Sequence, residues 1–316
     1  MTTLLSPRWW GLPLLSLVLS SCTASPTSLA PGEHHAVVEG VRLTYTVAGR
    51  ASDAHPPVVF LHGGPGYNSH SFAVQAGPLL EPTHRMIYLD QRGAGRSERP
   101  WTNDYSMERL VADLEALRRH WGQPKLTLMG HSFGGTLALE YAARHPDRVD
   151  RMVLVGPLSD APASTTGWAQ HVATWFPAEW AAAQAPGRSQ YERTMDAIGR
   201  AGGESVFNRL QFPNDQPRLR QDSIDAASGL SNTGEQSAAL FGQGLADYQF
   251  SAHERLPMPV LVLGGTHDFA IGIESMQRLA QSLPRATMAT YAGAGHFPYL
   301  DHPERFAADI AQFLLD

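Results

Sequence analysis

The sequence predicts an α/β fold in which helices flank a mostly parallel central sheet and a helical cap is inserted into the chain. Short apolar runs alternate with amphipathic helical patterns before residue 159 and after residue 250. This alternation is typical of a parallel sheet covered by helices on both faces. The segment between them, 159–250, has no strand-like run and is rich in Ala, Gln and Trp, so we expect it to form the cap.

The elements expected before the cap begin with an antiparallel hairpin over residues 37–47. Four buried strands follow, at 58–61, 86–89, 126–129 and 152–155. Apolar residues recur at helical spacing from Met107 to Leu117, and a second helix after residue 132 should end before Pro146, because the residue preceding a proline disfavours the α region. After the cap we expect strands at 260–263 and 287–291, a helix near 275–283, and a last helix that begins at Pro303.

Composition favours a globular protein. Of its 316 residues, 43% are hydrophobic and 17% charged, which is too apolar for a disordered chain. The net charge of −6 comes with no basic stripe, so nucleic acid is not an expected partner.

The first 22 residues have the pattern of a secretory signal. Arg8 precedes an apolar run over residues 9–19, about half of the roughly 20 residues that a spanning helix needs. The chain's single cysteine, Cys22, follows this run in a context that resembles the lipobox of bacterial lipoproteins. The resemblance implies lipidation of Cys22 and a location in the bacterial cell envelope, outside the cytoplasm, with a lipid anchor as the only attachment to the membrane. The alternative is an uncleaved leader on a cytoplasmic enzyme.

These patterns divide the chain into four parts. The signal covers residues 1–22, and a Ser-, Thr- and Pro-containing tether covers 23–34. The core comprises 35–158 and 251–316, and the cap comprises 159–250.

A serine is placed where a nucleophile is expected. Gly130-His131-Ser132-Phe133-Gly134 matches G-x-S-x-G and lies between an apolar strand and an amphipathic helix. The turn is too tight for side chains at positions 130 and 134, which explains the glycines. The alternative is an ordinary strand-to-helix turn with a capping serine.

A serine hydroxyl needs a base, and the base needs an orienting carboxylate. His296 follows the last expected strand, and Asp268 follows the strand before it, so the chain order is Ser, Asp, His. Asp160 is an alternative for the acid, since it follows the strand at 152–155. His131, His267 and His302 also lie near these positions, and we expect packing, hydrogen-bonding or capping roles for them.

Two backbone amides are candidates for the oxyanion hole, which stabilises the negative charge of a tetrahedral intermediate. One is the amide of Phe133, directly after the candidate nucleophile. The other is the amide of Gly64, in the glycine-rich segment after the strand at 58–61.

Three motifs give the chain a resemblance to the proline iminopeptidase branch of the α/β hydrolases. They are His62-Gly63-Gly64-Pro65-Gly66, Asp90-Gln91-Arg92-Gly93-Ala94-Gly95-Arg96-Ser97 and Gly130-His131-Ser132-Phe133-Gly134-Gly135. The resemblance covers the core on both sides of the cap. It implies the α/β-hydrolase fold, a helical cap over the active site, and hydrolysis without a metal or organic cofactor.

The resemblance also implies an aminopeptidase that releases N-terminal proline, or a similar residue, from small peptides. In that family, acidic side chains of the cap bind the substrate's α-amine, and the candidates here are Glu192, Glu204 and Glu235. The chain departs from the family in having Phe133 where the peptidases commonly have Trp. The alternatives are a carboxylesterase or lactonase that acts on a small ester, and a non-catalytic binding protein on the same fold. The cap contains six aromatic residues for which we expect one of two roles, lining an apolar pocket or packing in the cap's own core. They are Trp168, Trp175, Phe176, Trp180, Phe207 and Phe212.

Overall fold

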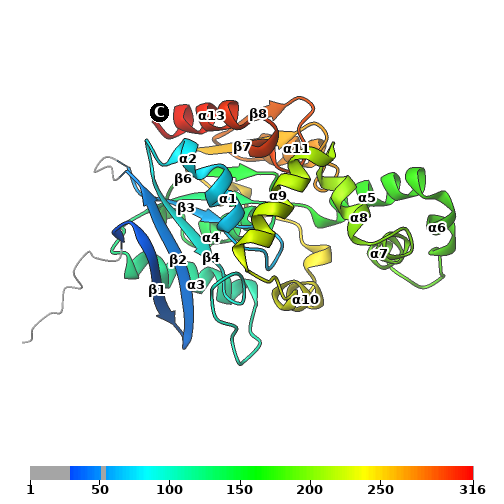
Figure 1. Ribbon diagram of the computed structural model, residues 1–316, viewed down its shortest axis with the longest axis horizontal. Helices are drawn as coiled ribbons and strands as arrows, with labels where there is room; N and C mark the ends of the chain where they lie inside the picture. Colours follow the sequence, from blue (N-terminus) through cyan, green and yellow to red (C-terminus); the bar gives the residue numbers. More distant parts are fainter. Residues whose placement is uncertain (1–28, 51–54, 316) are drawn as a thin grey trace, which may run out of the picture.

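The computed structural model describes residues 29–50 and 55–315, and it contains one eight-stranded sheet (Figure 1). The proposed signal, including Cys22, and residues 23–28 of the tether lie outside the described residues. The spatial order of the strands is β1-β2-β4-β3-β5-β6-β7-β8. β2 pairs antiparallel with β1 and β4, and all other neighbours are parallel. The predicted opening hairpin and mostly parallel sheet are therefore confirmed. The strands are β1 (Gly32–Val38), β2 (Val41–Gly49), β3 (Val58–Leu61), β4 (Arg85–Asp90), β5 (Leu126–His131), β6 (Val149–Val155), β7 (Val260–Gly265) and β8 (Ala286–Tyr291).

Helices cover both faces of the sheet, because successive strand residues point to opposite faces. On one face, alternate residues such as Phe60 and Tyr88 pack against α1, α2 and α13. On the other, residues such as Leu61 and Leu128 pack against α3, α4 and α11. These core helices, with a short α12, are α1 (His70–Gln75), α2 (Gly77–Leu80), α3 (Met107–His120), α4 (Phe133–Arg144), α11 (Ile273–Ser282), α12 (Pro298–Asp301) and α13 (Pro303–Leu315).

Six α-helices occupy the chain between β6 and β7, where the cap was expected. They are α5 (Ala161–Trp175), α6 (Pro177–Ala182), α7 (Gln190–Arg200), α8 (Glu204–Gln211), α9 (Asp215–Ser228) and α10 (Glu235–Gly242). In Figure 1, α5 to α8 project to the right of the sheet, whereas α9 and α10 lie closer to its edge. Backbone hydrogen bonds from Ala161 N to Tyr248 O (2.9 Å) and from Phe250 N to Ser159 O (2.9 Å) join the two ends of this insertion.

No helix within the described residues combines the length and the apolar content needed to cross a membrane.

Candidate active site

Ser132 lies on a sharp turn between β5 and α4. Its backbone has φ 55° and ψ −120°, a left-handed φ that non-glycine residues adopt only under constraint. Glycines on both sides make the turn possible. A Cβ at Gly130 would lie 2.4 Å from Gly134 O, and one at Gly134 would lie 2.0 Å from Leu61 O. The side chain of Ser132 is thereby held at the carboxyl end of the sheet.

His296 and Asp268 form a buried pair beside this turn. The distance from His296 Nδ1 to Asp268 Oδ2 is 2.8 Å, and the two residues are 4% and 2% exposed. The other carboxylate oxygen of Asp268 accepts hydrogen bonds from the amides of Ala270 and Ile271, both at 3.0 Å. These bonds fix the carboxylate. With Nδ1 bound to Asp268, Nε2 of His296 is left to accept a proton from a serine hydroxyl.

Gly156, at the end of β6, makes room for this pair and was not found from the sequence. A Cβ there would lie 3.0 Å from His296 Nδ1 and 3.1 Å from Asp268 Oδ2. Its φ of +49° also favours glycine. The only signal in the sequence is a glycine directly after a buried strand, which many turns share.

The motif at residues 90–97 holds the loop that contains Gly64. Gln91 donates from its backbone N to His62 Nε2 (3.1 Å) and from its side chain to His62 O (2.8 Å). Asp90 accepts from Ser69 N (2.9 Å) and Ser69 Oγ (2.7 Å). Burial alone would raise the pKa of Asp90, but the charge and hydrogen bonds of Arg96 outweigh it and hold that pKa below its usual value. Asp90 and Gln91 thus hold both ends of the glycine-rich loop.

The two candidate oxyanion donors belong to different elements, and both residues lie close to Ser132. The Phe133 amide is in the first turn of α4, where N–H groups have no acceptor within the helix. Gly64, at φ +114°, lines the same cavity as Ser132. A Cβ at the neighbouring Gly63 would lie 2.8 Å from Ser132 Cβ, so the loop passes directly against the serine.

A cavity of about 310 Å³ adjoins Ser132, His296 and Gly64. Its remaining walls come from α5, α7, α8 and α10 and from the loop after β7. Most wall residues are apolar or aromatic, and none of these described residues is an Asp, Glu, Lys or Arg. The neutral polar groups are Ser164, Thr165, Tyr191, Gln211 and Ser237. The cavity therefore suits a small, uncharged molecule, since a buried charge without a partner is costly.

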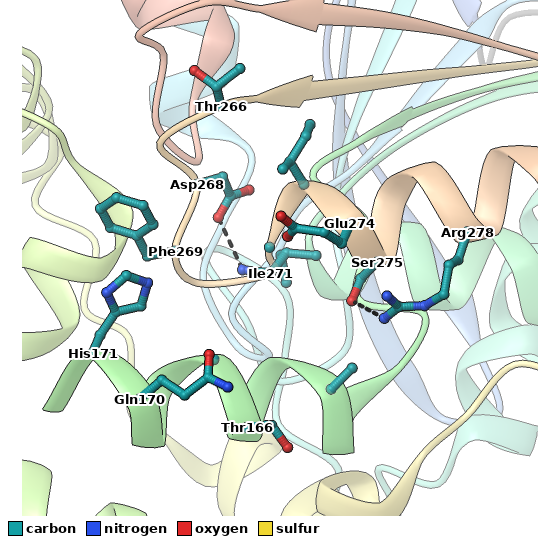
Figure 2. Close-up of a pocket in the computed structure, with 14 residues that line it drawn as sticks. Thr166, Gln170, His171, Thr266, Asp268, Phe269, Ile271, Glu274, Ser275 and Arg278 are labelled. Carbon is teal, nitrogen blue, oxygen red and sulfur yellow. Dashed lines mark hydrogen bonds between the residues drawn. The ribbon is translucent and has the colours of Figure 1, made fainter. Parts of the chain in front are cut away.

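A larger cavity of about 580 Å³ lies behind Asp268, between α5 and α11 (Figure 2). Figure 2 shows His171 and Gln170 on α5 facing Asp268, Glu274 and Arg278 across it. Neither Ser132 nor His296 is among its lining residues, so the smaller cavity is the one that can present a substrate to the serine.

The other residues considered for the acid and base have structural contacts. Asp160 caps α5 by accepting from Ala163 N (3.1 Å). His131 Nε2 donates to His296 O (3.0 Å), so its ring supports the loop that holds His296. His267 contacts Thr266 Oγ1 (3.1 Å), and His302 contacts Ala292 O (3.1 Å). Of the candidate acids, Asp268 is the one bonded to the His296 ring.

Glu192, Glu204 and Glu235 are all exposed, and none lines the cavity beside Ser132. Glu192 forms the capping box of α7 with Ser189. Glu204 is in the first turn of α8. Glu235 accepts from Tyr105 Oη (3.1 Å) and lies 3.6 Å from Arg99. The structure therefore does not bring the expected amine-binding carboxylates to the site, because each lies on the solvent side of its helix or is bonded elsewhere.

The cap aromatics divide between the two expected roles. Trp168 and Phe207 line the cavity, packed edge to face at 5.6 Å between ring centroids. Phe176 and Trp180 pack in the cap's own core, and Phe212 stacks on Phe297. Trp175 lies beneath the Arg209 guanidinium, 4.0 Å from the ring centroid.

In residues 29–50 and 55–315, no group of three or more His, Cys, Asp or Glu is arranged to hold a metal ion.

The chain belongs to the α/β-hydrolase fold family, whose model matches residues 56–303. It is 29% identical to a 2-hydroxymuconate semialdehyde hydrolase of Pseudomonas sp. (strain CF600), over 84% of this chain and 89% of that one. It is 26% identical to a proline iminopeptidase of Lactiplantibacillus plantarum, over 87% and 97% of the two chains. A proline iminopeptidase-related protein from Thermus thermophilus has a similar structure, with a TM-score of 0.76 at 25% identity, over 90% and 98% of the two chains. The relatives of this chain thus include hydrolases of more than one specificity.

Proposed function

We propose that this protein is a serine hydrolase that cleaves small, uncharged carboxylic esters, lactones included. The observation that carries the proposal is the cavity of about 310 Å³ at Ser132 and His296, which has no Asp, Glu, Lys or Arg in its described wall. Its volume is near the lower end of the range of about 300–1,000 Å³ for ligand pockets, which favours a small substrate.

The roles follow from the geometry of the pair and the turn. Ser132 Oγ attacks the acyl carbon while His296 Nε2 takes the hydroxyl proton. Asp268 holds the imidazole by its Nδ1 and stabilises the imidazolium. The amides of Phe133 and Gly64 bind the oxyanion. His296 then protonates the departing alcohol, and water, deprotonated by His296, hydrolyses the acyl-enzyme.

Release of N-terminal proline is the second candidate, favoured by the similarity to proline iminopeptidases. A free α-amine would need a carboxylate at the cavity, and Glu192, Glu204 and Glu235 do not line it. Asp225 on α9 contacts the loop that contains Gly64, since its Oδ2 accepts a hydrogen bond from the Tyr67 hydroxyl. Its Oδ1 is buried with no hydrogen-bond donor, and Asp225 does not line the cavity beside Ser132. The neutral wall therefore favours an ester over a substrate with a free amine.

The test uses the purified full-length protein in mild detergent, with Ser132→Ala as control. The substrates are p-nitrophenyl butyrate, proline p-nitroanilide and its N-acetylated form. We expect turnover of the butyrate ester by the wild type and none above background by Ser132→Ala. Fast cleavage of only the free-amine prolyl substrate would replace the ester proposal with the aminopeptidase one.

A second set of variants checks amine recognition directly. Glu192→Gln, Glu204→Gln and Glu235→Gln should each leave kcat/KM for the butyrate ester within about twofold of the wild type, since exposed carboxylates away from the site contribute little. A rise in KM confined to the prolyl anilide in one variant would identify that glutamate as an amine ligand.

We also propose that Cys22 anchors the protein to the bacterial cell envelope through a lipid. Its position after a short apolar run with one preceding cation supports this location. Cells grown with an alkyne-tagged fatty acid should label the wild type and not Cys22→Ser. Equal labelling of the two would contradict the anchor.

A further inference from the structure

Tyr67 connects the glycine-rich loop to the cap. It follows Gly66 in the loop, and its hydroxyl donates to Asp225 Oδ2 on α9. The same hydroxyl accepts from Gln221 Nε2 at 3.1 Å and lies 2.9 Å from Ser71 Oγ. Asp225 and Gln221 are four residues apart, so they share one face of α9. One phenol thus joins the loop, α1 and the cap helix.

A second contact joins the loop to α10. Gln236 is fully buried, and its side chain donates to Arg92 O at 3.2 Å. A Cβ at Gly66 would lie 3.4 Å from Gln236 Cβ, so α10 packs directly on the loop. Arg92 is itself held by two 2.6 Å hydrogen bonds to the buried carboxylate of Asp113. The α10 contact is therefore anchored in the core.

The loop depends on such contacts for its shape. Gly64 and Gly66 have φ of +114° and +85°, and glycines have the largest conformational freedom of any residue. Asp90 and Gln91 fix the loop's two ends from the core, at Ser69 and His62. Gly64 lies between these ends, close in the chain to Tyr67, whose hydroxyl is bonded to the cap. An oxyanion donor must lie 2.7–3.1 Å from the position that the oxyanion will occupy.

We propose that Tyr67 and Asp225 are positioning residues that hold the Gly64 amide in the oxyanion hole. The position of α9 relative to the glycine-rich loop then determines the catalytic rate. The proposal rests on the proposed serine-hydrolase function. It requires no contact between either side chain and the substrate. Neither residue lines the cavity at Ser132, which separates positioning from substrate binding.

The variants distinguish the effect on activity of losing the Tyr67 hydroxyl from that of losing the Asp225 charge and from that of a general loss of stability. Tyr67→Phe removes the hydroxyl and keeps the ring. Asp225→Ala removes the acceptor, while Asp225→Asn retains an oxygen that can accept from Tyr67. Tyr141→Phe is the matched control, because the hydroxyl of Tyr141, a buried tyrosine, also donates to a carboxylate, Glu115 Oε2 at 2.8 Å, away from the loop.

The measurements, on full-length protein, are kcat and KM for p-nitrophenyl butyrate, Ki for a trifluoromethyl alkyl ketone, and the thermal unfolding midpoint. The ketone forms a tetrahedral adduct with serine whose oxygen occupies the oxyanion hole. We expect Tyr67→Phe and Asp225→Ala to lower kcat and raise Ki by about 10- to 100-fold, the scale of a misplaced catalytic group, with KM within about twofold. Asp225→Asn should recover most of the activity, and Tyr141→Phe should lose stability without loss of kcat.

Two results would overturn the positioning proposal. One is wild-type kcat and Ki in Tyr67→Phe and Asp225→Ala. The other is a fall in kcat for Tyr141→Phe as large as for Tyr67→Phe, which would make the effect one of stability. Failure of the hydrolase proposal is seen separately, as wild-type protein that does not hydrolyse the ester and does not react with a fluorophosphonate at Ser132.

Discussion

Gly156 lies against the His296 ring so closely that a single added methyl group would stand 3.0 Å from Nδ1, the atom bonded to Asp268. Gly156→Ala should therefore lower kcat, because the new methyl group must push the imidazole or the carboxylate from its place. A displacement of this kind costs on the order of 10²-fold in rate. Ester hydrolysis by the purified variant measures it.

Gly122→Ala is the matched control for backbone strain. Gly122 has φ +66°, and a Cβ there meets nothing within 4 Å. Both variants should lose about 1 kcal/mol of unfolding free energy from the left-handed backbone, and only Gly156→Ala should lose activity. Equal activity in the two variants would refute the role assigned to Gly156.

Asp268→Asn should remove nearly all activity while leaving the fold intact. An amide in place of the carboxylate can donate to Nδ1, which stabilises the wrong tautomer and leaves the imidazolium without a counter-charge. The expected fall in kcat is roughly 10⁴-fold, the scale known for this change in a serine-protease triad.

Asp160→Asn tests the alternative acid in the same assay. Asn caps helices as well as Asp does, so α5 should remain capped and kcat should stay within about twofold of the wild type. Loss of activity in Asp160→Asn with retention in Asp268→Asn would reverse the two assignments.

The sequence predicted the parts of this site that depend on chain order and local geometry. Ser132 was predicted as the nucleophile from the tight turn that Gly130 and Gly134 allow, and Asp268 and His296 were predicted as its partners because each follows a strand of a parallel sheet. The structure brings Asp268 and His296 into one hydrogen-bonded pair. The predicted fold class was confirmed as well, because the short apolar runs that alternate with helical patterns correspond to strands of the sheet.

The cap was less predictable, because its contacts join residues far apart in the chain. Tyr67 and Asp225 are separated by 158 positions, and no local pattern of either residue indicates the other. The orientation of Glu192 and Glu235 likewise depends on how α7 and α10 pack on the core.

His131 should make the stability of the protein depend on pH. Burial, reinforced by the neighbouring His296 ring, holds the pKa of His131 well below its usual value, whereas in the unfolded chain it returns to about 6.5. Below a pH of about 6.5, His131 binds a proton in the unfolded chain but stays neutral in the folded state. The free energy of unfolding should therefore fall as the pH drops, by up to about 1.4 kcal/mol per pH unit for this group.

Urea unfolding at pH 7 and pH 5 measures this dependence. His131→Gln keeps a donor for His296 O and removes the titrating ring, so its unfolding free energy should fall less between the two pH values than that of the wild type. His62, whose pKa burial also lowers, should supply part of the remaining slope. An identical slope in wild type and His131→Gln would contradict the assignment.

Phe207 should limit the length of the acyl chain that the cavity accepts. Its ring lines the cavity wall and packs edge to face on Trp168. Phe207→Leu enlarges this wall, so each added methylene of a longer ester can be buried at about 0.8 kcal/mol, equivalent to about fourfold in kcat/KM. Comparison of p-nitrophenyl butyrate with the hexanoate should then show a shift of up to about 15-fold toward the hexanoate. Phe176→Leu is the control, because Phe176 packs in the cap core and does not line the cavity. It should leave the butyrate-to-hexanoate ratio unchanged, and a shift as large as that of Phe207→Leu would mean that loosening the cap, rather than the shape of this wall, determines chain length.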